Sequence, residues 1–241
     1  MIETFKTFEK FYLSQKSFPE VINFSKESFE SMMQLYSQAV CFPLTQRDAD
    51  GRRVVVTRMS LLNPDEFPAH DVFRLMAFVV LVLLEEEETQ IAGFSFISDI
   101  SNITARHVFT PTFAMRLVSL MSKGLPIRFK DIFYVDMPAV AKFLVDLFAS
   151  KAKEKMNSRF VIIDSKELKD HIDLKILPKE YGGVETSQEM MESFRNVMEE
   201  KKEKIIEYSK VSINWSKVPE RDLISNETEG GNGSFRKLDI D

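Results

Sequence analysis

Residues 170–183 read Asp170-His-Ile-Asp-Leu-Lys-Ile-Leu-Pro-Lys-Glu-Tyr-Gly-Gly183 and are the most informative stretch of the chain. Before them, residues 159–164 hold the apolar run Phe-Val-Ile-Ile, which predicts a short strand. Residues 165–171 are polar and have the composition of a helical turn. The stretch therefore follows a strand and a short helix, and the chain before it shows the same alternation.

Segments with the two-residue period of strands alternate with segments of helical period. Asp and Gly in residues 47–51 predict a tight turn between the first two strands. Strands separated by helices of ten or more residues require βαβ crossovers, so we expect an α/β domain with a largely parallel sheet. The expected strands are 40–44, 53–59, 93–99, 127–136 and 159–164, and the expected helices are 71–88, 110–123 and 138–148.

The flanks of this domain are helical in pattern. Residues 20–38 are polar and Ser-rich, which predicts a shorter helix and a linker. A helix from 187 to 209 is expected to turn Met190, Met191, Phe194, Val197, Met198, Ile205 and Ile206 inward. We therefore expect four parts: 1–37 as an N-terminal helical region, 38–184 as the α/β domain, 185–215 as a helix packing on it, and 216–241 as a disordered tail.

Composition excludes several protein classes. The chain of 241 residues has 32 basic and 37 acidic side chains, a formal charge of −5, and 44% apolar residues with few Gly and Pro, so disordered and collagen-like classes do not fit. One cysteine, Cys41, cannot form an internal disulfide and suits a reducing compartment. The N-terminus has no secretory h-region, so we expect a cytoplasmic protein.

Enzyme signatures are missing from the sequence. There is no Gly-x-Gly-x-x-Gly, no phosphate-binding Gly-x-x-x-x-Gly-Lys-Ser/Thr and no Gly-x-Ser-x-Gly. The three histidines are far apart and lack partners at metal-ligand spacing. Glu85 to Glu88 has the pattern of a solvated helix end rather than of a catalytic carboxylate pair. We therefore expect neither catalysis nor a metal nor a cofactor.

Basic residues gather in one part of this acidic chain. Such a patch indicates an anionic partner of limited extent. The alternative is that these basic side chains form a solvated surface without a partner. Nucleic acid is a poor candidate because the overall charge is negative and no recognition helix is visible. Anionic lipid head groups fit better. The residues are Lys123, Arg128, Lys130, Lys151, Lys153, Lys155 and Arg159.

Leu177-Pro-Lys-Glu-Tyr-Gly-Gly183 resembles the closing motif of the CRAL-TRIO lipid-binding domain family, in its alpha-tocopherol transfer branch. Asp50-Gly-Arg-Arg-Val-Val55, Asp71-Val-Phe-Arg74 and Leu125-Pro-Ile-Arg128 resemble other parts of that domain in the same order. The resemblance implies a mixed, largely parallel sheet that floors a hydrophobic lipid cavity, with flanking helices and a mobile helical gate.

The resemblance also implies roles for particular residues. An apolar helix face most often packs in the hydrophobic core. For each cavity residue, core packing without ligand contact is therefore the alternative. The implied ligand-cavity residues are Phe73, Met76, Ala77, Val80, Phe94, Phe96, Ser98, Leu117, Leu120, Met121 and Ile132. The implied gate residues are Val140, Phe143, Leu144, Leu147 and Phe148. The implied phosphoinositide-binding residues are Arg128, Lys130, Lys151, Lys153 and Lys155.

By this resemblance the protein is a monomeric, non-enzymatic carrier that holds one hydrophobic ligand, such as a tocopherol or a retinoid, and exchanges it at phosphoinositide-containing membranes. A trafficking or signalling adaptor with a vestigial cavity is the alternative. The chain departs from the family in a shortened N-terminal helical region, in a gate about one helical turn shorter, and in Asn157-Ser158 where His-Gly is common.

Overall fold

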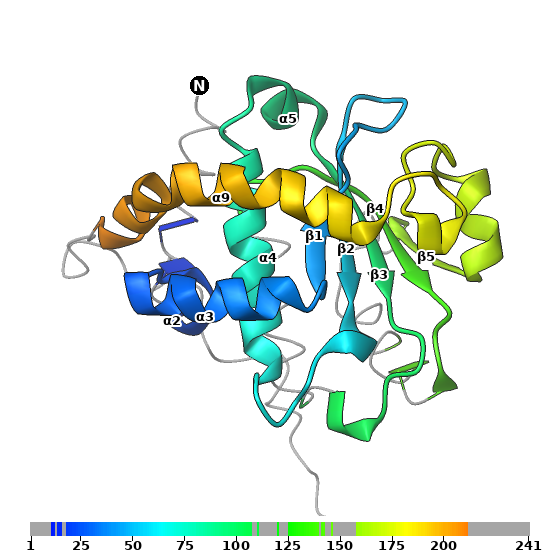
Figure 1. Cartoon of the computed structure of the whole chain (residues 1–241), viewed down its shortest axis with the longest axis horizontal. Coiled ribbons are helices and arrows are strands. Elements are labelled where there is room, and N and C mark those ends of the chain that lie inside the picture. The colour runs from blue at the N-terminus through cyan, green and yellow to red at the C-terminus, as the bar shows by residue number, and fades with distance from the viewer. Residues whose placement is uncertain are drawn as a thin grey trace, which may run out of the picture.

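A five-stranded sheet forms the centre of the computed structural model (Figure 1). The structure describes residues 11–12, 14–15, 18–107, 110, 120, 125–139, 141–142, 146 and 158–211. The strands lie in the order of the chain, β1 pairs antiparallel with β2, and the remaining pairs are parallel. This confirms the expected α/β class with a mixed, mostly parallel sheet. The strands are β1 (Cys41–Pro43), β2 (Arg53–Arg58), β3 (Phe94–Asp99), β4 (Phe129–Val135) and β5 (Phe160–Ile163).

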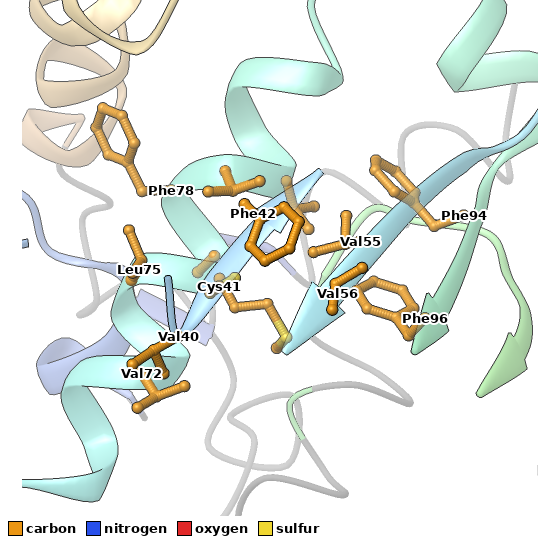
Figure 2. Packing of buried hydrophobic residues seen from close by; sticks show 14 of the residues in the cluster. Val40, Cys41, Phe42, Val55, Val56, Val72, Leu75, Phe78, Phe94 and Phe96 are labelled. Atoms are coloured by element: carbon orange, nitrogen blue, oxygen red, sulfur yellow. The ribbon is translucent and has the colours of Figure 1, made fainter. Parts of the chain in front are cut away.

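Helix α4 (Ala69–Leu83) follows β2 and runs back along the β1 edge of the sheet (Figure 1). Its apolar side chains fill the space between helix and sheet, where Val72 and Leu75 lie beside Val40 and Cys41 (Figure 2). On another side of α4, Phe78 packs edge-on against Phe24, with the ring centroids 5.3 Å apart. The helix is thus buried on nearly all sides, as a helix with so few polar residues must be.

The expected helix over 71–88 is wrong at its C-terminal end. It ends at Leu83, and a separate short helix, α5 (Glu87–Ala92), begins after Glu86, whose backbone is extended. The break places the Glu86 carboxylate between two arginines of the β1–β2 hairpin: Arg47 Nη2 and Arg53 Nη2 each lie 2.6 Å from a different oxygen. The charge-assisted hydrogen bonds between Glu86 and the two arginines therefore stabilise the break more than the backbone bonds of an unbroken helix would.

The four glutamates consequently do not form one solvated helix end. Glu85 pairs with Lys204 and accepts a 2.9 Å hydrogen bond from the Tyr208 hydroxyl, which joins it to the C-terminal helix. Burial alone would raise the pKa of Glu86, but hydrogen bonds from Arg53 and Thr89 and the charges of both arginines hold it below its ordinary value. Glu87 and Glu88 are exposed, as the sequence pattern indicates.

Three helices outside the sheet cover α4 and β1. Helix α2 (Pro19–Ile22) and helix α3 (Lys26–Ser37) pack on α4, so residues 20–38 are more than a short helix and a linker. Helix α9 (Ser187–Lys210) crosses α4 and β1 (Figure 1). The Tyr36 hydroxyl donates a 2.9 Å hydrogen bond to the Met191 carbonyl and joins α3 to α9. Val197 is exposed, which corrects its expected inward position.

Residues 165–183, which we call the closing segment, pack on one face of the sheet. They contain two short 3-10 helices, Ser165–Asp170 and Lys179–Tyr181. Leu168, Ile172 and Leu177 are buried, and the His171 ring lies 5.2 Å from the Phe133 ring on β4. The segment therefore supplies an apolar cover for this face.

The two glycines of the closing segment are there for steric reasons. Gly182 has φ +92°, a left-handed conformation that glycine adopts without penalty. At Gly183 a Cβ atom would lie 1.6 Å from the Leu177 carbonyl oxygen, which no small shift can relieve. The Gly183 N–H also donates a 3.1 Å hydrogen bond to the Pro178 carbonyl. The motif thus folds the chain back onto itself at a distance that only glycine permits.

Replacing Gly183 with alanine is expected to lower the free energy of unfolding by more than about 2 kcal/mol, because the added methyl group collides with backbone rather than with a movable side chain. Chemical denaturation followed by circular dichroism measures the change. Val184→Ala is the control, since Val184 is 82% exposed and its truncation should change stability by less than about 0.5 kcal/mol. Equal stability of Gly183→Ala and the wild type would contradict the steric argument.

Replacing Glu86 with glutamine is expected to lower the free energy of unfolding at pH 7 by about 1 kcal/mol, since two arginines lose their shared carboxylate at a partly exposed site. The ordinary pKa of this group is 4.5 and the folded value is lower, so the stabilisation is complete above about pH 4.5 and disappears as the pH falls through the folded pKa. The difference between wild type and variant should therefore shrink in acid.

Denaturant titrations between pH 7 and pH 3 measure this difference. Glu88→Gln makes the same chemical change at an exposed side chain next to the same Arg47, and it should have a much smaller effect. A Glu86→Gln difference that stays constant down to pH 3 would refute the role given to the carboxylate.

Candidate functional site

One face of the sheet gathers apolar side chains from several strands, and we call it the floor face. Residues paired across parallel strands point to the same side, and so do residues two apart along a strand. Val55 pairs with Phe96, which pairs with Ile132, so these three share the face. By the same register the floor face comprises Cys41, Pro43, Arg53, Val55, Thr57, Phe94, Phe96, Ser98, Phe129, Ile132, Tyr134, Phe160 and Ile162.

The centre of the floor face is aromatic and dry. Phe94, Phe96 and Ile132 are only 0%, 4% and 3% exposed. The Phe94 and Phe96 rings are stacked at 6.0 Å, and the Phe96 ring lies 5.2 Å from that of Phe129. Figure 2 shows the first two rings reaching from β3 toward β2. All four strand positions expected in the cavity, Phe94, Phe96, Ser98 and Ile132, thus lie on a single face.

Phe129 is a floor residue that sequence reasoning missed. A strict two-residue alternation would put Phe129 and Ile132 on opposite faces, because they are three residues apart. The register between β3 and β4 shifts between Phe94 and Phe96, so that Phe129 pairs with Phe94 while Ile132 pairs with Phe96. The bulge adds one residue to β4. The apolar pattern of β4 alone does not indicate this bulge.

The expected cavity residues of α4 occupy one side of that helix. Phe73, Met76, Ala77 and Val80 recur at i, i+3, i+4 and i+7, on the side opposite Phe78. Phe73 is half-buried and the other three are buried. Met76, Ala77 and Val80 belong to the same cluster of apolar side chains as Phe94, Phe96 and Ile132, and Phe73 packs against that cluster. The structure therefore places these residues in one core, and contact with a ligand remains a prediction.

Several predicted site residues lie outside the described residues. These are Leu117 and Met121 of the cavity, all five gate residues (Val140, Phe143, Leu144, Leu147 and Phe148), and Lys123, Lys151, Lys153 and Lys155 of the basic patch. Leu120 is described and is buried. Within the gate range, Ala141 is buried and Lys142 is exposed. The proposed roles of the gate and of the three lysines thus remain predictions.

Three residues of the basic patch are described: Arg128 and Lys130 lie at the amino end of β4, and the half-buried Arg159 lies just before β5. Arg128 and Lys130 are both exposed. Arg128 donates a 3.3 Å hydrogen bond from Nη1 to the Ile91 carbonyl, which orients its side chain along the end of α5. Ile91 itself is exposed. This corner of the sheet therefore presents two exposed cations, and one of them is bonded to the backbone of an exposed apolar residue.

A polar cluster joins the carboxyl ends of β2 and β3 to the closing segment, on the face opposite the floor. Asp99 accepts hydrogen bonds from the Tyr181 hydroxyl and from Ser101, while Arg58 bonds Glu180 at 3.3 Å. Burial and the Asp99 carboxylate raise the pKa of Tyr181, so its hydroxyl stays a donor. Each polar group has a structural partner, and the cluster serves to hold the closing segment.

Burial raises the pKa of the Cys41 thiol, so the thiolate required of a nucleophile is suppressed. The part of the chain that the structure describes contains no group of three or more metal-ligating side chains. Within the same residues, no helix combines the length and the hydropathy needed to cross a bilayer. The prominent feature is the apolar floor face.

Comparison with known proteins adds independent observations. Alpha-tocopherol transfer protein-like of Homo sapiens is 29% identical over 178 residues, which cover 72% of this chain and 51% of that protein. Clavesin-2 of Mus musculus is 25% identical over 184 residues, covering 75% and 55%. The chain spans about half the length of the curated relatives it matches.

Among solved structures, the crystal structure of Sfh5 aligns with a TM-score of 0.49 and 19% identity, covering 64% of this chain and 58% of that one. The model of the CRAL/TRIO domain matches residues 37–183, more than half of the sequence. The matched region begins just before β1 and ends at the second glycine of the closing segment. The chain therefore belongs to the CRAL/TRIO domain family.

Proposed function

We propose that the protein is a non-enzymatic lipid-binding and transfer protein that holds one hydrophobic molecule against the floor face and exchanges it at membranes. The observation that carries the proposal is the aromatic floor: Phe94, Phe96 and Phe129 side by side on neighbouring parallel strands. Membership of the CRAL/TRIO family and likeness to a protein named alpha-tocopherol transfer protein-like support it.

Burial of apolar surface supplies enough affinity for such a carrier. A ligand that removes roughly 400 Å² of apolar surface from water gains about 10 kcal/mol before the costs of association are subtracted. Apolar and aromatic side chains gain this energy with lipids of many shapes, because the gain depends on buried area and not on direction. The floor face thus suits a tocopherol, a retinoid or a similar lipid equally well.

We place the gate at residues 138–148. Its apolar positions Val140, Phe143, Leu144, Leu147 and Phe148 would cover the ligand when the gate is shut and contact lipid when it is open. A membrane that binds the open state better shifts the population toward it. Exchange at a membrane then needs no covalent step.

We also propose that the basic patch directs the protein to phosphoinositide-containing membranes. Arg128 and Lys130 are exposed at the same corner of the sheet, next to the exposed Ile91. Lys151, Lys153 and Lys155 complete the patch in the sequence. Basic side chains near an anionic surface contribute about 1 kcal/mol each.

A phosphoinositide-binding trafficking or signalling adaptor is the second candidate. The observation that favours it is the close packing of the floor rings, with centroids 5.2 Å and 6.0 Å apart, which is the spacing of a filled core. In the adaptor the basic patch would act while the floor face stayed without a ligand. The two candidates therefore differ in whether a lipid is held.

Phe94→Asp is expected to abolish uptake of a fluorescent tocopherol or retinoid analogue, because it puts a carboxylate in the middle of the dry floor. Phe94→Leu keeps the surface apolar and should retain uptake within about threefold. Fluorescence transfer from donor vesicles measures both. Ser98→Phe, at a half-buried floor position, should also reduce uptake and covers the case in which Phe94→Asp does not fold. Normal uptake by folded Phe94→Asp and Ser98→Phe proteins would reject the assignment.

Removing the two exposed cations of the patch that the structure describes, with Arg128→Gln and Lys130→Gln, should weaken binding to phosphoinositide vesicles by roughly tenfold or more while leaving bound lipid in place. The control is Lys201→Gln with Lys202→Gln, which removes the same charge from helix α9. Vesicle sedimentation at fixed ionic strength compares the two. Equal loss of binding in both double variants would show a net-charge effect and reject the patch.

A further inference from the structure

Three hydroxyl side chains cross the floor face in a single row. Thr57 on β2 pairs with Ser98 on β3, and Ser98 pairs with Tyr134 on β4. Neighbouring strands lie about 4.8 Å apart, so the three residues succeed one another at this spacing on the same side of the sheet. The row continues to Cys41 on β1 and Ile162 on β5. We call Thr57, Ser98 and Tyr134 the hydroxyl row.

The hydroxyl row differs sharply from the rest of the floor face. The adjacent row toward the amino ends of the strands is Val55, Phe96 and Ile132, and beyond it lie Phe94 and Phe129. Exposure increases in the same direction on β3 and β4: Phe96 and Ile132 are 4% and 3% exposed, whereas Ser98 and Tyr134 are half-buried. The floor face is thus dry at one end and polar at its more open end.

Some hydroxyl groups of the hydroxyl row form no strong hydrogen bond within the described part of the chain. The single Thr57 hydroxyl proton is shared between the Ile97 carbonyl at 3.4 Å and Ser98 Oγ at 3.3 Å, two long contacts that leave the Ser98 proton available. In the described part of the chain, no group bonds the Tyr134 hydroxyl, although its ring packs against Phe160 at 6.0 Å. A partly buried hydroxyl without a partner is costly unless something supplies one.

The row carries no charge. Burial raises the pKa of Tyr134 to about 12, so the phenol remains a neutral donor and acceptor. The charged residues that follow on the strands, Arg58 and Asp99, point to the opposite face and are held by Glu180 and Tyr181. At the amino end of the floor face, Arg53 is ion-paired with Glu86. Both arginines of β2 next to the floor face are therefore paired with glutamates and are not free to bind an anionic head group at the row.

We infer that the hydroxyl row is the head-group subsite of the lipid site, and that the ligand is a lipid with one neutral hydrogen-bonding group, a hydroxyl or a carbonyl. Its polar end lies over Ser98 and Tyr134, and its apolar body extends over Phe96, Ile132 and Phe94. This inference rests on the proposed function, because it names the ligand class and the direction of the ligand in the same site.

The experiment offers the protein a choice of lipids. Phosphatidylcholine vesicles carry equal amounts of cholesterol, retinol and α-tocopherol, each with one neutral hydroxyl, together with squalene, a hydrocarbon, and oleate, a carboxylate. The protein is re-isolated and its bound lipid is quantified by mass spectrometry. The wild type should hold hydroxyl lipids in at least roughly tenfold excess over squalene and oleate.

The double variant Ser98→Ala with Tyr134→Phe removes two hydroxyls and little volume. Its preference for hydroxyl lipids over squalene should fall by about tenfold while total squalene uptake is kept. Ser95→Ala is the matched control, because it removes a buried hydroxyl from the opposite face of the same strand, and it should keep the wild-type preference. Circular dichroism confirms that each variant is folded.

Three outcomes overturn the inference. Uptake of squalene, oleate or phosphatidylcholine in preference to hydroxyl lipids would reject the subsite and leave the carrier function standing. A preference that survives in the double variant, or is lost equally in Ser95→Ala, would also reject it. A folded wild type that retains no lipid at all would reject the proposed function, and the subsite with it.

Discussion

The pairing of β3 between β2 and β4 determines which side chains share each face of the sheet. Because successive residues of a strand alternate, Phe94, Phe96 and Ser98 point one way and Ser95, Ile97 and Asp99 the other. A slip of one residue would exchange the two sets and place Asp99 on the dry floor. The bulge in β4 is consistent with this constraint, since it brings Phe129 to the floor beside Phe96.

The register of β2, β3 and β4 is stable only if the face of the sheet opposite the floor face is also covered. The closing segment does this with Leu168, Ile172 and Leu177, and its polar end is fixed where Tyr181 meets Asp99 and Glu180 meets Arg58. The last residues of β2 and β3 are thus bound to the motif that ends the domain. Gly183 permits the backbone return on which this contact depends. The closing segment, which contains the family motif, therefore packs on the face of the sheet opposite the floor face.

Sequence patterns predicted the strands well because apolar runs bounded by turn residues are local signals. All five strands lie within one or two residues of the expected ranges, with β4 one to two residues shorter at its ends. The break after Leu83 was missed because it depends on Arg47 and Arg53, which are more than thirty residues away from Glu86. The floor position of Phe129 was missed because a bulge is a property of the pairing. Tyr134 was missed because its row appears only once three strands are in register.

The central claim is that the floor face holds a lipid. Native mass spectrometry of the protein purified from cells without added lipid tests it most directly, because a complex held by apolar burial survives purification when dissociation is slow. The account predicts one lipid per chain, with a single neutral polar group. A folded protein that appears only at the mass of the bare chain, yet still sediments with phosphoinositide vesicles, would contradict the claim.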